Sequence, residues 1–114
     1  MIENLIESHV AAFNAHDLEN LMAGFADDAV WITGRSTARG RAELTDLFAG
    51  AMAGLLPTLT IQNLIVGEGQ AAAQMVETFT HEGVSRTDHI AGFYVVRDGL
   101  IASAKIYREG SAEL

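Results

Sequence analysis

Two carboxylates occupy positions where an alternating β-strand pattern should be apolar. The segment ETFTHEGVSRTDHIAG, residues 77–92, alternates, turns at a glycine and alternates again, with Glu77 before the turn and Asp88 after it. If Glu82 and Gly83 form a two-residue hairpin turn, Glu77 and Asp88 become direct cross-strand neighbours. A four-residue turn would keep both acids on one face of the sheet without placing them opposite each other.

A facing pair of carboxylates indicates a particular chemistry. Two half-buried carboxylates repel each other when both are ionised, so one of them is expected to hold a proton and to be available as a donor. A proton donor beside a carboxylate base suits enolisation, dehydration or aldol-type cyclisation. The pair is therefore a candidate acid/base site.

A cation is expected beside the two acids. The segment VVRDGLI favours a hairpin with a three-residue loop at residues 97–99, in which Gly99 takes the left-handed position next to a bulge. Asp88 then pairs with Arg108, and Glu77, Asp88 and Arg108 lie on three adjacent strands. The trio could be a proton-transfer site. Alternatively, Arg108 could neutralise the two acids, and the trio would then only serve to close the barrel.

Two histidines and a set of apolar side chains are further candidates for a binding site. His81, beside the turn, could act as an acid or base at the mouth of a cavity or could lie at the surface. His9 lies on the apolar stripe of residues 2–14, where it could donate a hydrogen bond into a cavity or be a core histidine. The remaining candidates would line a pocket for a flat or hydrophobic small molecule, although core packing alone explains most of them: Phe13, Met22, Trp31, Met52, Met75, Phe79 and Tyr94. The four histidines lie on different elements, so no metal site is expected.

The elements that must position these residues are helices first and strands afterwards. Apolar residues recur at helical spacing over residues 2–14, and Asp17 is a suitable N-cap for a short second helix. A third helix runs from Gly40 and ends before Pro57. Strands are expected at the segments AVWITG, TLTIQNLIVG, AAAQMVETFTH, RTDHIAGFYVV and LIASAKIYR, with RSTAR as a loop. This order predicts one α+β domain over residues 1–114, with three helices on one face of a curved antiparallel sheet.

Composition argues against several kinds of partner. Seven Lys and Arg against fifteen Asp and Glu give a formal net charge of −8, which repels a phosphate backbone, so no nucleic acid partner is expected. The absence of cysteine excludes disulfides, thiolate nucleophiles and zinc-thiolate sites. The first residues lack a basic segment, and no apolar run reaches the roughly 18 residues of a membrane span. We therefore expect neither export nor membrane insertion, and a cytoplasmic location.

Three segments give the chain a family resemblance. FNAHDLENLMAGFADDAVW, GRAELTDLF and FYVVRDGLIASAKIY, together with the order of elements, resemble the SnoaL-like branch of the NTF2-like superfamily. The resemblance implies a cone-shaped barrel, in which a strongly curved mixed or antiparallel sheet wraps the first helix and leaves a pocket at the wide end. The branch includes polyketide cyclases. The superfamily includes ketosteroid isomerases, limonene-epoxide hydrolases, dehydratases and binding proteins, so the fold names a pocket and leaves its chemistry open.

The catalytic positions of two such relatives hold other residues in this chain. A ketosteroid isomerase would have an aspartate, a tyrosine and a second acid where this chain has Thr33, His9 and Gly92, and a limonene-epoxide hydrolase would have an aspartate at Ile106. The resemblance also implies which sheet face is inside. The inner face would carry Met75, Glu77, Phe79, His81, Asp88, Ile90, Gly92, Tyr94, Ala104, Ile106 and Arg108. The outer face, with Phe93 and Tyr107, would be the surface through which many relatives form dimers.

Two interpretations follow. The first is a cofactor-independent isomerase, cyclase or dehydratase that moves a proton on a small apolar carbonyl compound. In it Asp88 and Glu77 are the acid/base pair, and Arg108 sets their charge or holds an anionic group of the substrate. The residues that contact the substrate would be His9, Phe13, Trp31, Met52, Met75, Phe79, His81, Tyr94 and Arg108. The second is a non-catalytic module that binds a hydrophobic ligand or serves for dimerisation. A homodimer through the outer sheet face is expected.

Overall fold

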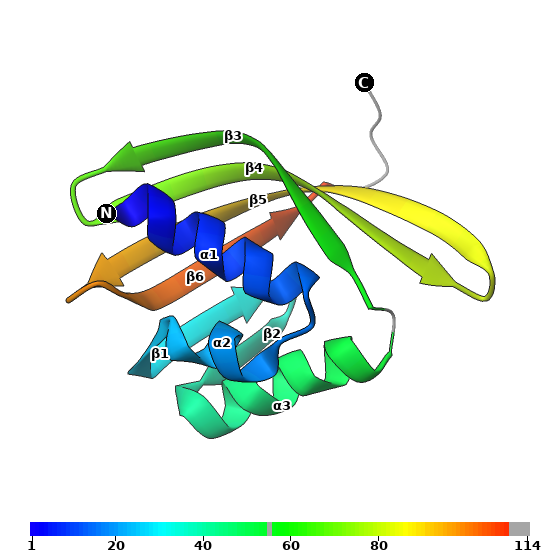
Figure 1. Ribbon diagram of the computed structural model, residues 1–114, viewed down its shortest axis with the longest axis horizontal. Helices are drawn as coiled ribbons and strands as arrows, with labels where there is room; N and C mark the ends of the chain where they lie inside the picture. Colours follow the sequence, from blue (N-terminus) through cyan, green and yellow to red (C-terminus); the bar gives the residue numbers. More distant parts are fainter. Residues whose placement is uncertain (55, 110–114) are drawn as a thin grey trace.

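The described part of the protein consists of three helices on one face of a six-stranded mixed sheet (Figure 1). The structure is a computed structural model that describes residues 1–54 and 56–109. Its elements in chain order are α1 (Ile2–Asn14), α2 (Leu18–Ala23), β1 (Phe25–Thr33), β2 (Ser36–Arg39), α3 (Gly40–Ala53), β3 (Thr58–Gly67), β4 (Gln70–His81), β5 (Val84–Arg97) and β6 (Leu100–Arg108). None of the described helices is long and apolar enough to cross a membrane.

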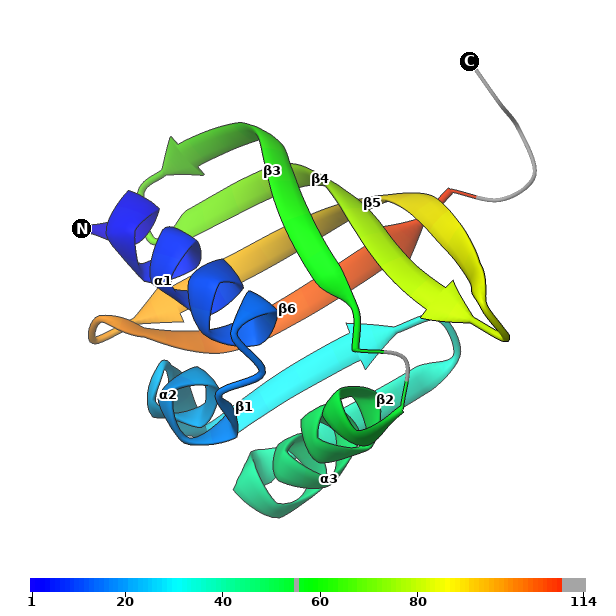
Figure 2. The ribbon, with the colours of Figure 1, turned by 45° about the vertical axis from the view of Figure 1, so that its right-hand side comes forward.

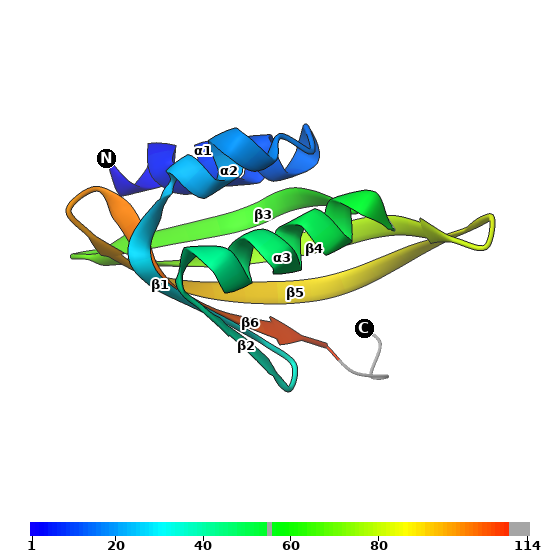
Figure 3. The same cartoon turned by 90° about the horizontal axis from the view of Figure 1, so that it is seen from below.

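The strands follow the order β2-β1-β6-β5-β4-β3 across the sheet. The β1–β6 pair is parallel and every other neighbouring pair is antiparallel. The sheet curves around the helices, which all lie on its concave side (Figures 2 and 3). The predicted α+β fold with three helices on a curved sheet is confirmed, and the sheet is open between its edge strands β2 and β3 rather than closed.

The first half of the sheet is larger than the sequence predicted. Residues 36–39, expected to be a loop, form β2, which pairs with β1 through Trp31 and Ala38. Strand β1 begins at Phe25 instead of Ala29, and its register against β6 shifts between Phe25 and Val30. Both differences have one cause: pairing with neighbouring strands outweighs the weak β-propensity of the polar segments in the sequence.

The β4–β5 hairpin has the predicted two-residue turn. Glu82 and Gly83 have φ angles of 52° and 77°, as the turn that matches strand twist requires. Glu77 is paired with Asp88, as the sequence predicted. The predicted face is also confirmed, because inward-facing Tyr94 is buried whereas its outward-facing neighbour Phe93 is 53% exposed. The tip of this hairpin extends beyond the helices (Figure 1).

The β5–β6 hairpin differs from the prediction in register. Its turn has two residues, Asp98 and Gly99, instead of three, and a bulge follows in the ladder. Arg108 is therefore paired with Ile90, and the predicted pairing with Asp88 is wrong. The error amounts to two residues, which preserves the side-chain parity of a strand. Arg108 thus still points to the same face of the sheet as Asp88.

Candidate functional site

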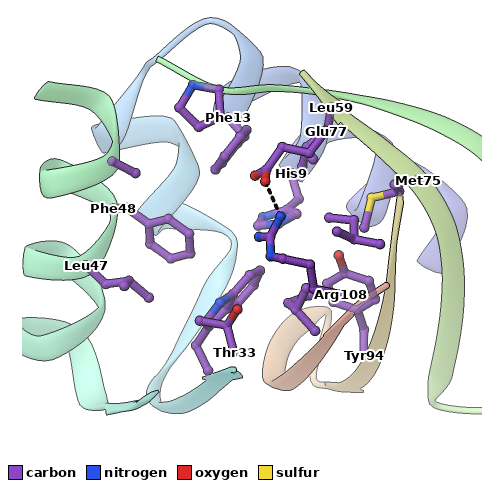
Figure 4. Close-up of a pocket in the computed structure, with 15 residues that line it drawn as sticks. His9, Phe13, Thr33, Leu47, Phe48, Leu59, Met75, Glu77, Tyr94 and Arg108 are labelled. Carbon is purple, nitrogen blue, oxygen red and sulfur yellow. Dashed lines mark hydrogen bonds and ion pairs between the residues drawn. The ribbon is translucent and has the colours of Figure 1, made fainter. Parts of the chain in front are cut away.

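A cavity of about 130 Å³ lies between α1, α3 and the concave face of the sheet (Figure 4). Most of its wall is apolar, and five side chains bring polar groups to it: His9, Thr33, Glu77, Tyr94 and Arg108. The apolar part consists of Phe13, Trp31, Leu47, Phe48, Ala51, Pro57, Leu59, Met75, Ile90 and Ile106. An apolar cavity of roughly 150 Å³ can hold benzene, so this space matches a compound with a single small ring.

Helix α1 is fixed over the sheet at its C-terminal end. The Asn14 side chain donates to the Leu59 carbonyl at 2.8 Å and accepts from the Leu59 amide at 2.6 Å, which ties the helix to β3. On the same helix, His9 and Phe13 belong to the buried stripe and lie in the cavity wall. The amide clamp therefore determines how deeply these two side chains reach into the cavity.

Among the five polar side chains of the cavity wall, only those of His9 and Tyr94 are buried. They are 4% and 1% exposed, and their ring centroids are 5.9 Å apart. Among the described residues, neither imidazole nitrogen of His9 has a hydrogen-bond partner, and the Tyr94 hydroxyl has none either. Burial lowers the pKa of His9 to about 4 and raises the pKa of Tyr94, so both side chains are neutral at pH 7.

The Tyr94 hydroxyl lies in space that a side chain at residue 92 would fill. A Cβ atom built on Gly92 would be 2.7 Å from Tyr94 Oη and 2.8 Å from two ring carbons. Real Cβ atoms do not come this close, and the buried ring cannot move aside without repacking. The Tyr94 hydroxyl can therefore lie where it does only because residue 92 is a glycine.

The three charged residues predicted from the hairpin registers do meet. Arg108 Nη1 donates to Glu77 Oε1 at 2.6 Å and to Asp88 Oδ2 at 2.7 Å. Partial burial works against the charge of Arg108, but its bonds to Glu77 and Asp88 outweigh this effect and raise the pKa of the guanidinium. The guanidinium thus lies where the sequence analysis expected a proton, between the two acids. It removes the repulsion that would have forced one of them to be protonated.

Both acids line an outer pocket, but only Glu77 also lines the cavity. Glu77 has a side chain only 14% exposed and lines the cavity together with Arg108. Asp88 is 34% exposed and lines an outer pocket of about 360 Å³, as does Phe79. Glu77 and Arg108 belong to both walls, so their ion pair lies between the cavity and the outer pocket. Figure 4 shows this pair beside the apolar lining.

Seven of the predicted site residues line the cavity: His9, Phe13, Trp31, Met75, Glu77, Tyr94 and Arg108. Asp88 and Phe79 belong to the outer pocket instead, and the side chain of His81 lies outside the described part of the structure. Met52 is not in the cavity wall, because α3 turns Leu47, Phe48 and Ala51 toward the cavity and leaves Met52 packed against the core.

Several lining residues were not among the predicted site residues. For Leu47 and Phe48 a signal existed, because both lie on the apolar stripe of the third helix. Ile90 and Ile106 were predicted on the inner face of the sheet, and both do line the cavity. Ala51, Pro57 and Leu59 carry no comparable signal, because their place in the wall depends on how the chain runs from α3 into β3. No group of three or more His, Cys, Asp or Glu within residues 1–54 and 56–109 could hold a metal ion.

Comparisons with known proteins agree on a family and a fold. The sequence profile of the family described as "SnoaL-like domain" matches residues 6–104. An LEH-like epoxide hydrolase from M. tuberculosis is similar in structure, with a TM-score of 0.84 at 19% identity, covering 93% of this chain and 80% of that one. A candidate polyketide cyclase from Sinorhizobium meliloti has a TM-score of 0.81 at 18% identity, covering 91% and 94% of the two chains.

A third solved structure has a similar fold. It is a protein from Catenulispora acidiphila with a ketosteroid isomerase-like fold, crystallised with trimethylamine, with a TM-score of 0.83 at 18% identity and coverage of 90% and 83%. Identities this low establish the fold and leave the activity open. Among curated proteins, none is significantly similar in sequence.

Proposed function

Because the chain belongs to the family of SnoaL-like domains, we propose that it is a cofactor-independent enzyme that moves a proton on a small apolar carbonyl compound. One observation carries the proposal: the nearly buried carboxylate of Glu77 lies in the wall of a mostly apolar cavity. A buried charge without a role in folding is costly, and a carboxylate facing an apolar cavity is a typical arrangement for a general base.

The proposed reaction is an isomerisation through an enolate. The carboxylate of Glu77, which accepts a hydrogen bond from Arg108, takes a proton from the carbon next to the substrate carbonyl, and the electron pair of the C–H bond moves to the carbonyl oxygen. The same carboxyl then returns the proton to another carbon of the conjugated system. Atoms and charges balance without a co-reactant. A carboxylate is a weak base, so the substrate must have its C–H bond activated by the carbonyl group.

Asp88 has a different place in this proposal from the one that the sequence analysis expected. It contacts Arg108 from the outer pocket, so we assign it the role of a positioning residue that holds the guanidinium beside Glu77. The earlier role of Asp88 as proton donor requires a substrate that extends from the cavity into the outer pocket. The two roles differ in their kinetics, because a positioning residue affects the rate less than the base does.

Conversion of cyclohex-3-en-1-one to its conjugated isomer, followed by ultraviolet absorbance, tests the proposal with a probe of one ring. Glu77→Gln is expected to lower the rate by roughly 10²- to 10⁴-fold and Asp88→Asn by less. The matched control is Asp28→Asn, which removes an acid from the exposed Arg97–Asp28 ion pair and is expected to keep the wild-type rate. A folded Glu77→Gln variant with the wild-type rate would refute the role of Glu77. A wild-type protein that binds the probe without converting it would favour the non-catalytic binding module.

A further inference from the structure

The most unusual feature of the cavity is a pair of buried polar side chains whose hydrogen-bonding atoms have no partner among the described residues. Both imidazole nitrogens of His9 and the hydroxyl of Tyr94 are in this state, and both side chains line the cavity. More than nine in ten buried polar groups in proteins are hydrogen-bonded, so two adjacent exceptions facing one cavity require an explanation. Figure 4 shows the Tyr94 hydroxyl turned toward the middle of the lining side chains.

Both side chains are held rigidly. The His9 ring contacts Phe25 edge-on at 5.5 Å between centroids and Trp31 at 5.6 Å, and it meets Tyr94 at 5.9 Å. Gly92 leaves the space in which the Tyr94 hydroxyl lies. Groups that are fixed before a ligand arrives lose little entropy on binding, which favours affinity.

We propose that His9 and Tyr94 form an oxygen-binding site at the buried end of the cavity, selective for the oxygen of a one-ring ketone or of its enol. Tyr94 donates its hydroxyl proton to the ligand oxygen. The His9 imidazole, which no protein partner holds in one tautomer, donates its N–H to the same oxygen or accepts the hydroxyl proton of an enol. The ring of the ligand fills the apolar part of the cavity, whose volume of about 130 Å³ matches a single small ring.

The site rests on the proposed function and narrows its substrate class. A ligand whose oxygen is bound by His9 and Tyr94 would share the cavity with the more exposed Glu77–Arg108 pair. An oxygen that gains negative charge in the enolate is stabilised by hydrogen-bond donors that are already in position. The ligand class is therefore a compact cyclic ketone that can enolise, and phenol is a stable mimic of its enol.

Phenol and toluene form a matched pair of probes, because they have nearly the same shape and differ in the hydroxyl. Their dissociation constants are measured by NMR titration for the wild-type protein and for Tyr94→Phe, a change that removes one oxygen atom. We expect the variant to bind phenol about tenfold more weakly and toluene at least as tightly as the wild type, because one hydrogen bond in a buried site is lost. His9→Phe is expected to have the same selective effect.

Three outcomes would overturn the oxygen site. They are a wild-type protein that does not bind phenol, a phenol-to-toluene ratio that Tyr94→Phe leaves unchanged, and an equal loss of both ligands, which would mean that the cavity had only changed shape. The Glu77→Gln variant separates this proposal from the catalytic one. If Glu77→Gln loses turnover while Tyr94→Phe keeps the wild-type ratio of the phenol and toluene dissociation constants, only the proposed oxygen site is wrong. If Glu77→Gln keeps turnover while Tyr94→Phe selectively loses affinity for phenol, only the proposed role of Glu77 is wrong.

Discussion

Acid is expected to destabilise the folded protein through a single buried imidazole. In the folded state the pKa of His9 is about 4 because burial disfavours the charged ring, whereas its ordinary value is 6.5. As the pH falls below 6.5, the unfolded chain binds a proton at His9 and the folded protein does not. Stability from this group is therefore complete above pH 6.5 and is lost between pH 6.5 and pH 4. Because the two pKa values differ by about 2.5, the free energy of unfolding falls by about 2 kcal/mol at pH 5 and by roughly 3.4 kcal/mol well below pH 4.

Urea unfolding of the wild type and of His9→Phe at a series of pH values between 7.5 and 4.5 isolates this contribution. Carboxylates titrate in both proteins, so the difference between the two pH profiles reports on His9 alone. Phenylalanine keeps a ring of similar size among Phe25, Trp31 and Tyr94. We expect the wild type to lose about 2 kcal/mol more than the variant between pH 7.5 and pH 5. His89→Asn, which removes an exposed imidazole, serves as the control. Parallel pH profiles for the wild type and His9→Phe would refute the reasoning, because they would mean that the folded protein admits a proton at His9.

Two further predictions concern glycine 92 and the outer face of the sheet. Gly92→Ala is expected to destabilise the fold by roughly 1–3 kcal/mol, and this cost should vanish in a Tyr94→Leu background, which lacks the atoms that the new Cβ would meet. An equal cost in both backgrounds, measured by urea unfolding, would contradict the account. We also propose a homodimer through the outer face, where Phe93 and Tyr107 are about half exposed and their rings are 5.7 Å apart. Phe93→Asp should then halve the mass found by sedimentation, whereas Val84→Asp at the hairpin tip should not.

The sequence predicted those parts of the sheet that depend on local rules. The β4–β5 register followed from a turn of two residues and from strand parity, so Glu77 and Asp88 face each other as expected. The β5–β6 register did not follow, because a bulge beyond the turn is set by packing on both sides of the strand. Strand β2 was missed for a related reason: its four residues become a strand only through pairing with β1.

The candidate site shows the same division between local and tertiary information. Residue types and alternation were sufficient to bring Glu77, Tyr94 and Arg108 to one face of the sheet and His9 to the buried face of the first helix. They could not tell that only Glu77 reaches the inner cavity while both acids line the outer pocket, because the two acids are equivalent in a flat pairing diagram. The curvature of the sheet and the position of α3 make them different. The unpartnered state of His9 and Tyr94 likewise depends on every neighbour in three dimensions.

The polar groups at the buried end of the cavity have no advantage for folding alone. Phenylalanine at position 94 and leucine at position 9 would fill the same space without leaving polar atoms unpartnered, and each such atom costs about 1–3 kcal/mol. The total stability of a typical fold is roughly 5–15 kcal/mol, so keeping unpartnered polar atoms on both His9 and Tyr94 costs a considerable part of it. Gly92, which leaves room for the Tyr94 hydroxyl, adds a third position arranged for the same small space. A ligand oxygen that supplies the missing partners recovers this cost and stabilises the folded state by mass action. Binding at the oxygen site and resistance to unfolding are therefore coupled, and protonation of His9 in acid opposes both by the same desolvation that lowers its pKa.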